Sequence, residues 1–280
     1  MTLQQRETIL ATLPVAPAQP RAVGNLRLTT KARGSVSAID AFRTQGCMKA
    51  LFPRRADGLE AIVINTSGGL TGGDRLALDC GAGAGSRLVL TTQAAERAYR
   101  SASGWAQMDT KLHVGAGSRL DWLPQELILF EGARLKRSLR VEMEADARLL
   151  LVEPVIFGRM AMGEVLHDAA LRDRIEIWRD GVPLYCDALR LEGDLAARMA
   201  QPAVGRGAGA MASLVFVGPE AEAFLSPLRA VLPVTAGATL LQNDVLVARV
   251  LAEDGFALRQ TLLPALDRLS GEGLPISWRL

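Results

Sequence analysis

Apolar and polar residues alternate in three similar segments in the middle of the chain. An alternation of period two is typical of a β-strand with one buried face. Each segment is followed by a short turn and then by a second apolar run. The segments are residues 75–80, 110–114 and 138–143, and the runs that follow them are residues 88–93, 120–125 and 149–154. The pattern predicts strands joined in pairs.

The turns between these paired strands are repeated. The sequence GAGSRL at residues 83–88 returns at residues 115–120, and a weaker copy, EADARL, follows at residues 144–149. Glycine permits the positive φ values that tight hairpin turns require, so each unit is interpreted as a β-hairpin. One hairpin cannot bury its apolar face alone, whereas stacked neighbours form a shared core. The predicted fold is therefore mainly β, with stacked β-hairpins forming a superhelical, sandwich-like body.

The flanking segments extend this pattern. Residues 24–29 and 61–65 are predicted strands. Residues 174–186 are a predicted hairpin, because the Asp-Gly pair at Asp180 and Gly181 is a strong turn signal.

The last seventy residues have a different character. A strand at residues 213–217 precedes a predicted helix at residues 220–231, and a hairpin is expected around residues 243–244. A second helix is predicted at residues 254–269, because Leu258, Leu262, Leu266 and Leu269 fall on one face. Pro264 lies inside it and should kink or break it. Two helices are thus expected in the C-terminal part.

These patterns suggest three regions within one continuous domain. Residues 1–22, with three prolines, are a predicted loosely ordered N-terminal tail. Residues 23–200 form the β-hairpin repeat body, and residues 201–280 form an α+β part packed on it.

Composition narrows the class of protein. Hydrophobic residues make up 49% of the 280 residues, which is enough for a sizeable core. The net charge of +2 gives no electrostatic basis for binding nucleic acid or an anionic membrane. The longest uncharged stretch, residues 230–243, is shorter than the roughly 20 apolar residues of a membrane span. Three dispersed cysteines without a C-x-x-C pair predict neither a disulfide framework nor a zinc knuckle, and they suit a cytoplasmic location.

Residues 65–74, NTSGGLTGGD, resemble a phosphate-binding loop at first sight. A P-loop, however, has lysine followed by serine or threonine after its last glycine, whereas Asp74 follows Gly73 here. A carboxylate would repel phosphate, so we expect the two glycine pairs to allow sharp turns or close backbone approach instead. The only histidines, His113 and His167, are interpreted as ordinary strand and loop residues.

Several carboxylates stand among apolar residues, namely Glu126, Glu131, Glu153 and Glu164. Two interpretations remain open. Each acid either pairs with an arginine, for example Glu153 with Arg159, or lines a wet interior. Carboxylate oxygens suit hard cations, or nickel that is held only loosely.

Together with these residues, four stretches make the chain resemble the UreD family of urease accessory proteins, called UreH in some bacteria. They are NTSGGLTGGD (65–74), TTQAAERAYRS (91–101), WLPQELILFEGA (122–133) and EPVIFGRMAMGE (153–164), and the closing PISW (275–278) also fits. The residues that carry the resemblance are Asn65, Gly72, Gly73, Asp74, Gln93, Tyr99, Arg100, Gln125, Glu126, Gly158, Arg159, Gly163 and Glu164. The early stretches around residues 33–35 and 46–48 depart from the family pattern.

The resemblance implies a β-rich superhelical protein with no catalytic residues and no stably bound cofactor. It implies the partners UreF, the GTPase UreG and apo-urease, and a role in nickel insertion. Nickel would be in transit through a polar internal passage rather than at a fixed site. Asp74, Glu153 and Glu164 are then the candidate passage residues.

Two other classes compete with this interpretation. A β-helical carbohydrate-active enzyme would use paired carboxylates as acid and base, but four Trp and two Tyr provide few platforms for sugar rings. The second competing class is a β-rich interaction module without metal involvement.

Overall fold

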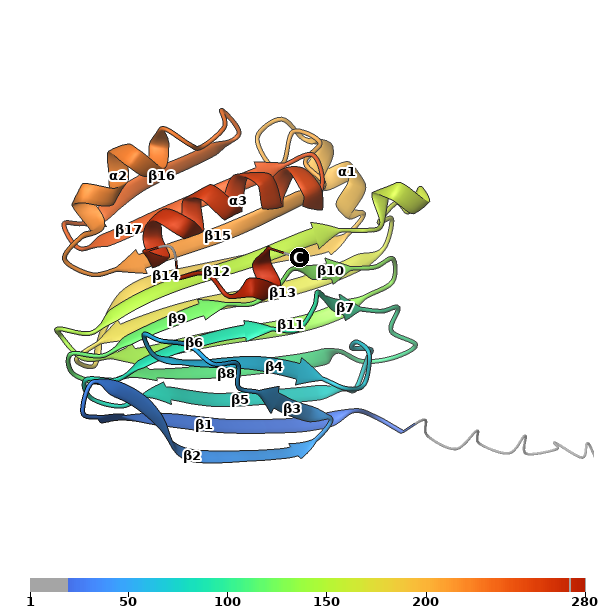
Figure 1. Ribbon diagram of the computed structural model, residues 1–280. Coiled ribbons are helices and arrows are strands. Elements are labelled where there is room, and N and C mark those ends of the chain that lie inside the picture. Colours follow the sequence, from blue (N-terminus) through green and yellow to red (C-terminus); the bar gives the residue numbers. More distant parts are fainter. Residues whose placement is uncertain (1–19, 272, 280) are drawn as a thin grey trace, which may run out of the picture.

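The computed structural model describes residues 20–271 and 273–279. The predicted tail therefore falls almost entirely outside the described residues. Two β-sheets face each other (Figure 1). Sheet A has the strand order β14-β13-β11-β8-β5-β1-β2, and sheet B has the order β16-β17-β15-β12-β9-β6-β4-β3. In sheet B, β10 also pairs with β12, and β7 pairs with β10.

The bounds of the elements are as follows. Sheet A contains β1 (Val23–Arg33), β2 (Val36–Gly46), β5 (Arg75–Ala82), β8 (Ala106–Val114), β11 (Arg134–Met143), β13 (Ala169–Arg179) and β14 (Val182–Gly193). Sheet B contains β3 (Met48–Leu51), β4 (Leu59–Asn65), β6 (Arg87–Thr92), β7 (Glu96–Ala98), β9 (Arg119–Leu123), β10 (Leu127–Leu129), β12 (Arg148–Phe157), β15 (Ala210–Val217), β16 (Ala236–Gln242) and β17 (Val245–Ala252). The helices are α1 (Leu195–Ala200), α2 (Ala221–Arg229) and α3 (Gly255–Ser270), with 3₁₀ turns η1 (Met160–Met162) and η2 (Ile276–Trp278).

The predicted mainly β, superhelical fold is confirmed, but the repeated unit is not a hairpin. The strands on either side of each Gly-rich turn lie in opposite sheets. Thus β5 pairs in parallel with β1 and β8, whereas β6 pairs in parallel with β4 and β9. Each turn bonds to the next copy of the turn, as when the Gly85 amide donates to the Ala116 carbonyl at 2.9 Å. The chain therefore winds as a two-sheet coil, because the turns stack on each other.

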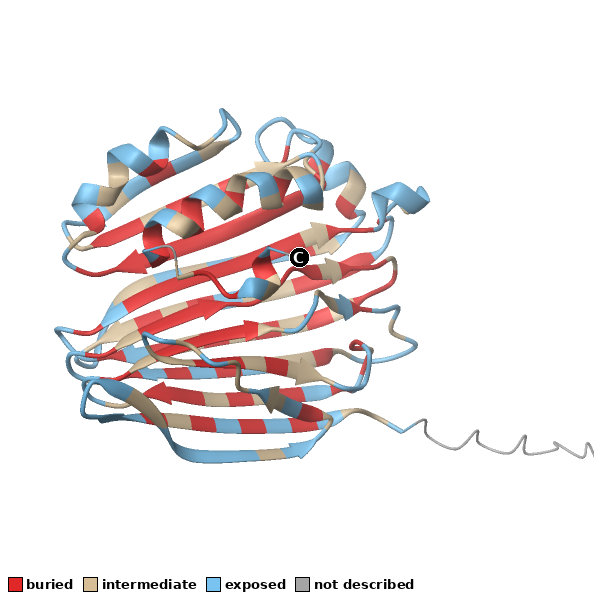
Figure 2. Cartoon of the chain, viewed as in Figure 1, coloured by how far each residue is buried: buried red, intermediate tan, exposed pale blue. Residues whose placement is uncertain are grey.

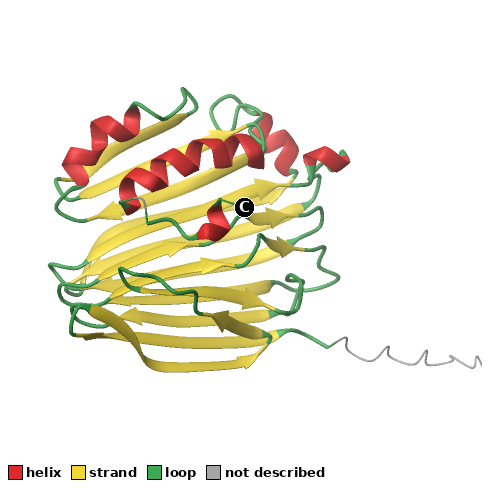
Figure 3. Ribbon diagram, viewed as in Figure 1, coloured by secondary structure: helices red, strands yellow, loops and turns green. Residues whose placement is uncertain are grey.

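The alternation in the strands builds the core between the sheets. Inward-facing residues such as Leu78, Leu112 and Val141 are buried, and their neighbours along each strand are more exposed (Figure 2). A second core lies between the outer face of sheet B and the C-terminal helices (Figure 3). Strand β12 faces both cores, so nearly all of its residues are buried.

The C-terminal elements agree with the sequence pattern in most respects. Strand β15, helix α2, the β16–β17 hairpin and helix α3 are all present. The four predicted leucines of α3 are buried. The Asp254 carboxylate caps the helix by accepting the Ala257 amide at 2.8 Å. The helix continues past Pro264 without a break, and the six-residue helix α1 was not predicted.

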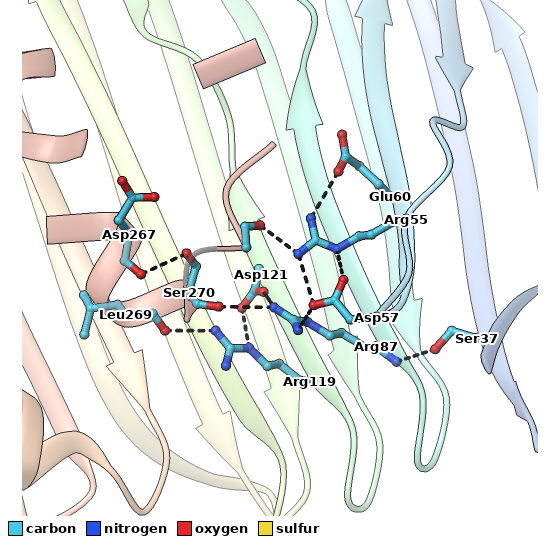
Figure 4. A network of polar contacts seen from close by, with 11 residues as sticks. Ser37, Arg55, Asp57, Glu60, Arg87, Arg119, Asp121, Asp267, Leu269 and Ser270 are labelled. Carbon is cyan, nitrogen blue, oxygen red and sulfur yellow. Dashed lines mark hydrogen bonds and ion pairs between the residues drawn. The ribbon is translucent and has the colours of Figure 1, made fainter. Parts of the chain in front are cut away.

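The repeated arginines hold α3 against sheet B (Figure 4). Arg87 and Arg119 occupy equivalent positions in β6 and β9, and both pair with the fully buried Asp121. Arg119 Nη2 donates to the Leu269 carbonyl at 2.9 Å, and Arg87 Nη2 donates to the Ser270 carbonyl at 3.4 Å. The final carbonyls of a helix lack intrahelical partners and carry partial negative charge. The GAGSRL repeat thus both turns the chain and anchors the C-terminal helix.

Candidate functional site

The stretches that resemble the UreD family gather at one end of the coil. They include the loops that lead from sheet B back to sheet A, at residues 66–74, 93–105, 124–133 and 158–168. We call this the loop end; it lies to the right in Figure 1. The GAGSRL turns lie at the opposite end, the turn end.

Backbone hydrogen bonds stack these loops on one another. The Tyr99 amide donates to the Leu70 carbonyl at 2.7 Å, and the Phe130 amide donates to the Ala98 carbonyl at 3.0 Å. Strand β10 also pairs in parallel with both β7 and β12. The four loops therefore form one layered surface, which makes the loop end the candidate functional site.

The first loop shows why its glycines and its aspartate are needed. A Cβ atom on Gly72 would lie 1.9 Å from Ser101 Oγ, and Gly73 has a φ of 93°. The Asp74 carboxylate accepts the Ala22 and Thr71 amides, each at 2.8 Å. These contacts agree with the expected close approach and sharp turn. Asp74 is buried and closes the loop through backbone groups.

A small cavity opens beside this loop. It has a volume of about 160 Å³ and is lined by residues that include Asn65, Gln93, Glu96, Met108 and Trp122. The Asn65 side chain donates to the Glu96 carboxylate at 3.2 Å. Burial raises the pKa of Glu96. Sequence reasoning did not select this acid, because Glu96 stands next to Arg97 and nothing in the local pattern indicates that it is buried.

Aromatic and charged groups meet on the exposed side of the loop end. The Tyr99 and Phe130 rings pack edge to face, with centroids 5.1 Å apart, and the Arg159 guanidinium lies 4.3 Å from the centre of the Phe130 ring. Arg100 Nη2 approaches Glu131 Oε1 at 4.0 Å and is largely exposed. These contacts join Tyr99, Phe130 and Arg159 in one cluster, and Arg100 and Glu131, the next residues in the chain, form a pair beside it.

Glu164 fixes the shape of the last loop. Arg159 Nε and Nη2 donate to its two carboxylate oxygens at 2.9 and 3.0 Å, and the Glu131 amide donates at 3.2 Å. Hydrogen bonds from Arg159 lower the pKa of Glu164 to about 2. Gly163, with a φ of 67°, ends η1. The turn is therefore held firmly while Met162 is 76% exposed.

Glu153 lies in the space between the two sheets. Its carboxylate accepts Trp122 Nε1 at 2.7 Å and pairs with Arg137. Arg137 also pairs with Asp173 on the neighbouring strand. The expected arginine partner is present, but it is Arg137 and not Arg159. Burial raises the pKa of Glu153, and the negative charge of the nearby Asp173 carboxylate raises it as well.

The three candidate passage residues do not converge. Within residues 20–271 and 273–279, no group of three or more His, Cys, Asp or Glu side chains is placed to hold a metal ion. Asp74 is held by backbone amides, and Glu153 and Glu164 are each held by an arginine. Their role in nickel transit stays a prediction.

The remaining family-like residues join the loop end to the C-terminus. Arg259 of α3 pairs with Glu126 at 2.9 Å and also binds the Gln125 side chain and the Trp278 carbonyl. Trp278 Nε1 donates to the Leu123 carbonyl at 2.9 Å. These contacts explain why the PISW segment accompanies the other stretches.

Both histidines are surface residues, as expected. The His113 side chain is 50% exposed on β8, and that of His167 is 71% exposed in the last loop.

Comparison with known proteins identifies the family. The sequence model described as UreD urease accessory protein matches residues 22–277. The chain belongs to the UreD family. It is 51% identical over 263 residues to the urease accessory protein UreD of Roseobacter denitrificans, covering 94% of this chain and 96% of that protein. It is 52% identical over 257 residues to the UreD protein of Ruegeria pomeroyi, covering 91% of this chain and all of that protein.

UreD membership gives the chain an accessory role in urease maturation. It confirms the resemblance inferred from the four stretches. Across the part of the chain that the structure describes, no helix is both long enough and apolar enough to span a membrane.

Proposed function

We propose that this chain is a non-enzymatic scaffold that joins UreF and the GTPase UreG to apo-urease and supports nickel insertion into urease. The observation that carries the proposal is the convergence of the family-like stretches on the loop end. There, internal contacts hold the loops in place while Tyr99, Arg100 and Met162 remain accessible. A rigid surface with exposed aromatic, arginine and methionine side chains favours protein binding.

Nickel, as the cargo, would move between the two sheets. In support, the carboxylates of two residues, Glu96 and Glu153, lie near one tryptophan. Trp122 lines the cavity that contains Glu96 and also donates to Glu153. Asp74 and Glu164 lie at the loop end, where they would stand near an entrance or exit.

The carbohydrate-enzyme alternative receives less support. Acid and base catalysis requires two carboxyl groups that face one open cleft. Glu153 is buried and engaged with Arg137, and Glu164 is engaged with Arg159. Neither acid is free to exchange a proton with a bound sugar.

The proposal is tested by restoring urease activity in cells that hold apo-urease, UreF and UreG but lack their own UreD protein. We expect a tagged wild-type chain to restore activity and to co-purify with all three partners. Met162→Asp, which places a charge on the exposed side of the loop end, should weaken both the restoration of urease activity and the co-purification of the partners. Ala84→Asp adds the same charge at an exposed position of the turn end and is the matched control.

A wild-type chain that neither co-purifies with these proteins nor restores urease activity would overturn the proposed function. If Met162→Asp and Ala84→Asp behave alike, the loop end is not the docking surface.

A further inference from the structure

A row of cations crosses the outer face of sheet A near the loop end. We call it the basic row; it consists of four cations and one neutral residue aligned on five adjacent strands, and they are Arg75 (β5), Gln107 (β8), Lys136 (β11), Arg172 (β13) and Arg190 (β14). Neighbouring strands are about 4.8 Å apart, and like charges directly opposite each other are destabilising. The row itself contains no carboxylate, and Glu192, beside it on β14, pairs with two of its four cations.

Another row on the same face shows the contrast. The balanced row is the segment Asp79, Lys111, Arg140 and Glu176 on β5, β8, β11 and β13, aligned in the same way. These four have equal numbers of acids and bases, and Arg140 approaches Glu176 at 3.6 Å; the alignment continues on β1 and β2 with Arg27 and Arg43. Across β5, β8, β11 and β13 the basic row therefore carries more positive charge than the balanced row.

The cations of the basic row are held in place. The Trp105 ring lies 5.2 Å from Lys136 Nζ and 4.6 Å from the Arg172 guanidinium carbon. Glu192 accepts from both Arg172 and Arg190, so one carboxylate serves two guanidinium groups. A groove of about 470 Å³ runs beside Lys136, Arg172 and Arg190. Positive charge, an aromatic ring and a groove thus occur together.

We propose that the basic row binds an acidic segment of a partner protein in the urease maturation assembly. This inference rests on the proposed function, since it assigns the chemistry of one partner. Carboxylates spaced along a polypeptide can meet the cations one by one and avoid Asp109 and Glu192, which flank the row. A nucleic acid carries a phosphate at every nucleotide, so it cannot place uncharged units beside those two acids as a polypeptide can. The charges would also speed the encounter of the two proteins.

The test measures binding of a fluorescein-labelled ten-residue peptide of alternating Glu and Ser to the full chain by fluorescence anisotropy, at low and high NaCl. Wild type should bind, and its affinity should fall as salt rises. The double variant Lys136→Glu with Arg172→Glu should bind about tenfold more weakly. Lys111→Glu with Arg140→Glu, in the balanced row, makes the same change in net charge and should bind much as wild type does.

Circular dichroism melting checks that each variant folds. If the variant Lys136→Glu with Arg172→Glu does not fold, the milder variant Lys136→Gln with Arg172→Gln replaces it. No peptide binding by wild type, or equal losses in the two rows, would overturn the inference. Binding of single-stranded DNA without binding of the peptide would overturn it as well.

Urease activation separates this inference from the proposed function. If wild type and the basic-row variant both restore urease fully, the inference fails and the function stands. If the wild-type chain itself restores no urease activity, the proposed function fails, and the peptide measurement still decides whether the basic row binds an acidic segment.

Discussion

Replacing Arg137 by methionine should destabilise the chain severely. Arg137 is the only cation in contact with the carboxylates of Glu153 and Asp173 in the described structure, and all three side chains are at most 9% exposed. Methionine has a similar length and fits an apolar core. The substitution therefore removes the charge with little loss of volume and leaves two buried carboxylates without a cation.

The magnitude follows from that geometry. Removing one partner of a buried ion pair costs about 3–5 kcal/mol, because the other charge stays buried without compensation. For a domain of this size, each kcal/mol lowers the melting temperature by about 2–4 °C, so we expect a decrease of roughly 6–20 °C. Glu153→Gln is the matched control. It leaves Arg137 paired with Asp173 and keeps an oxygen for Trp122 Nε1, so it should cost about 1 kcal/mol.

Thermal and urea unfolding, followed by circular dichroism, measure both variants. An Arg137→Met protein that melts within about 2 °C of wild type, or a Glu153→Gln protein that loses as much as Arg137→Met, would refute this account of the buried charges. The same control tests the passage. If nickel transit needs the Glu153 carboxylate, Glu153→Gln should fold and bind the partners while urease activation falls.

Three further predictions concern the loop end. Burial raises the pKa of Glu96, so the folded chain holds a proton there at pH values above about 4.3 where the unfolded chain has released it. The contribution of Glu96 to stability should therefore grow as the pH falls through this window, and melting experiments on Glu96→Gln should show that this contribution is missing. Arg159 lowers the pKa of Glu164 to about 2. The Glu164 carboxylate therefore stabilises the fold fully above its ordinary pKa of about 4.3, and this stabilisation is lost as the pH falls towards 2. In Glu164→Ala this part of the pH dependence of stability should be absent. Because Asp74 stands where a P-loop has lysine, calorimetry should detect no saturable binding of micromolar GTP to the isolated chain.

The strands and C-terminal helices were predictable because their signals are local. Alternation along residues 138–143 and the spacing of the α3 leucines each reflect one element facing one core. Hairpin and coil could not be distinguished in this way, because both use glycine in the turn. In the coil, the backbone of each turn bonds to the next copy of the repeat, as Gly85 does to Ala116. A contact between two copies of the repeat cannot be read from the local pattern of one copy.

The site was predictable in outline only. The four family-like stretches mark the loop end, but the partners of their carboxylates depend on the fold. Arg137 and Glu153 face each other from opposite sheets, so no spacing in the sequence indicates their pairing. By contrast, Arg159 and Glu164 are five residues apart within one turn, and their pairing could have been inferred from that short separation.

We propose that this chain enables nickel to reach urease. The most direct measurement is the nickel content of urease after purified apo-urease, UreF, UreG, GTP, bicarbonate and nickel are incubated with or without this chain. We expect nickel bound to urease, measured by mass spectrometry after removal of free metal, to increase only when the chain is present, together with urease activity. Equal nickel content and equal activity in the two samples would contradict it.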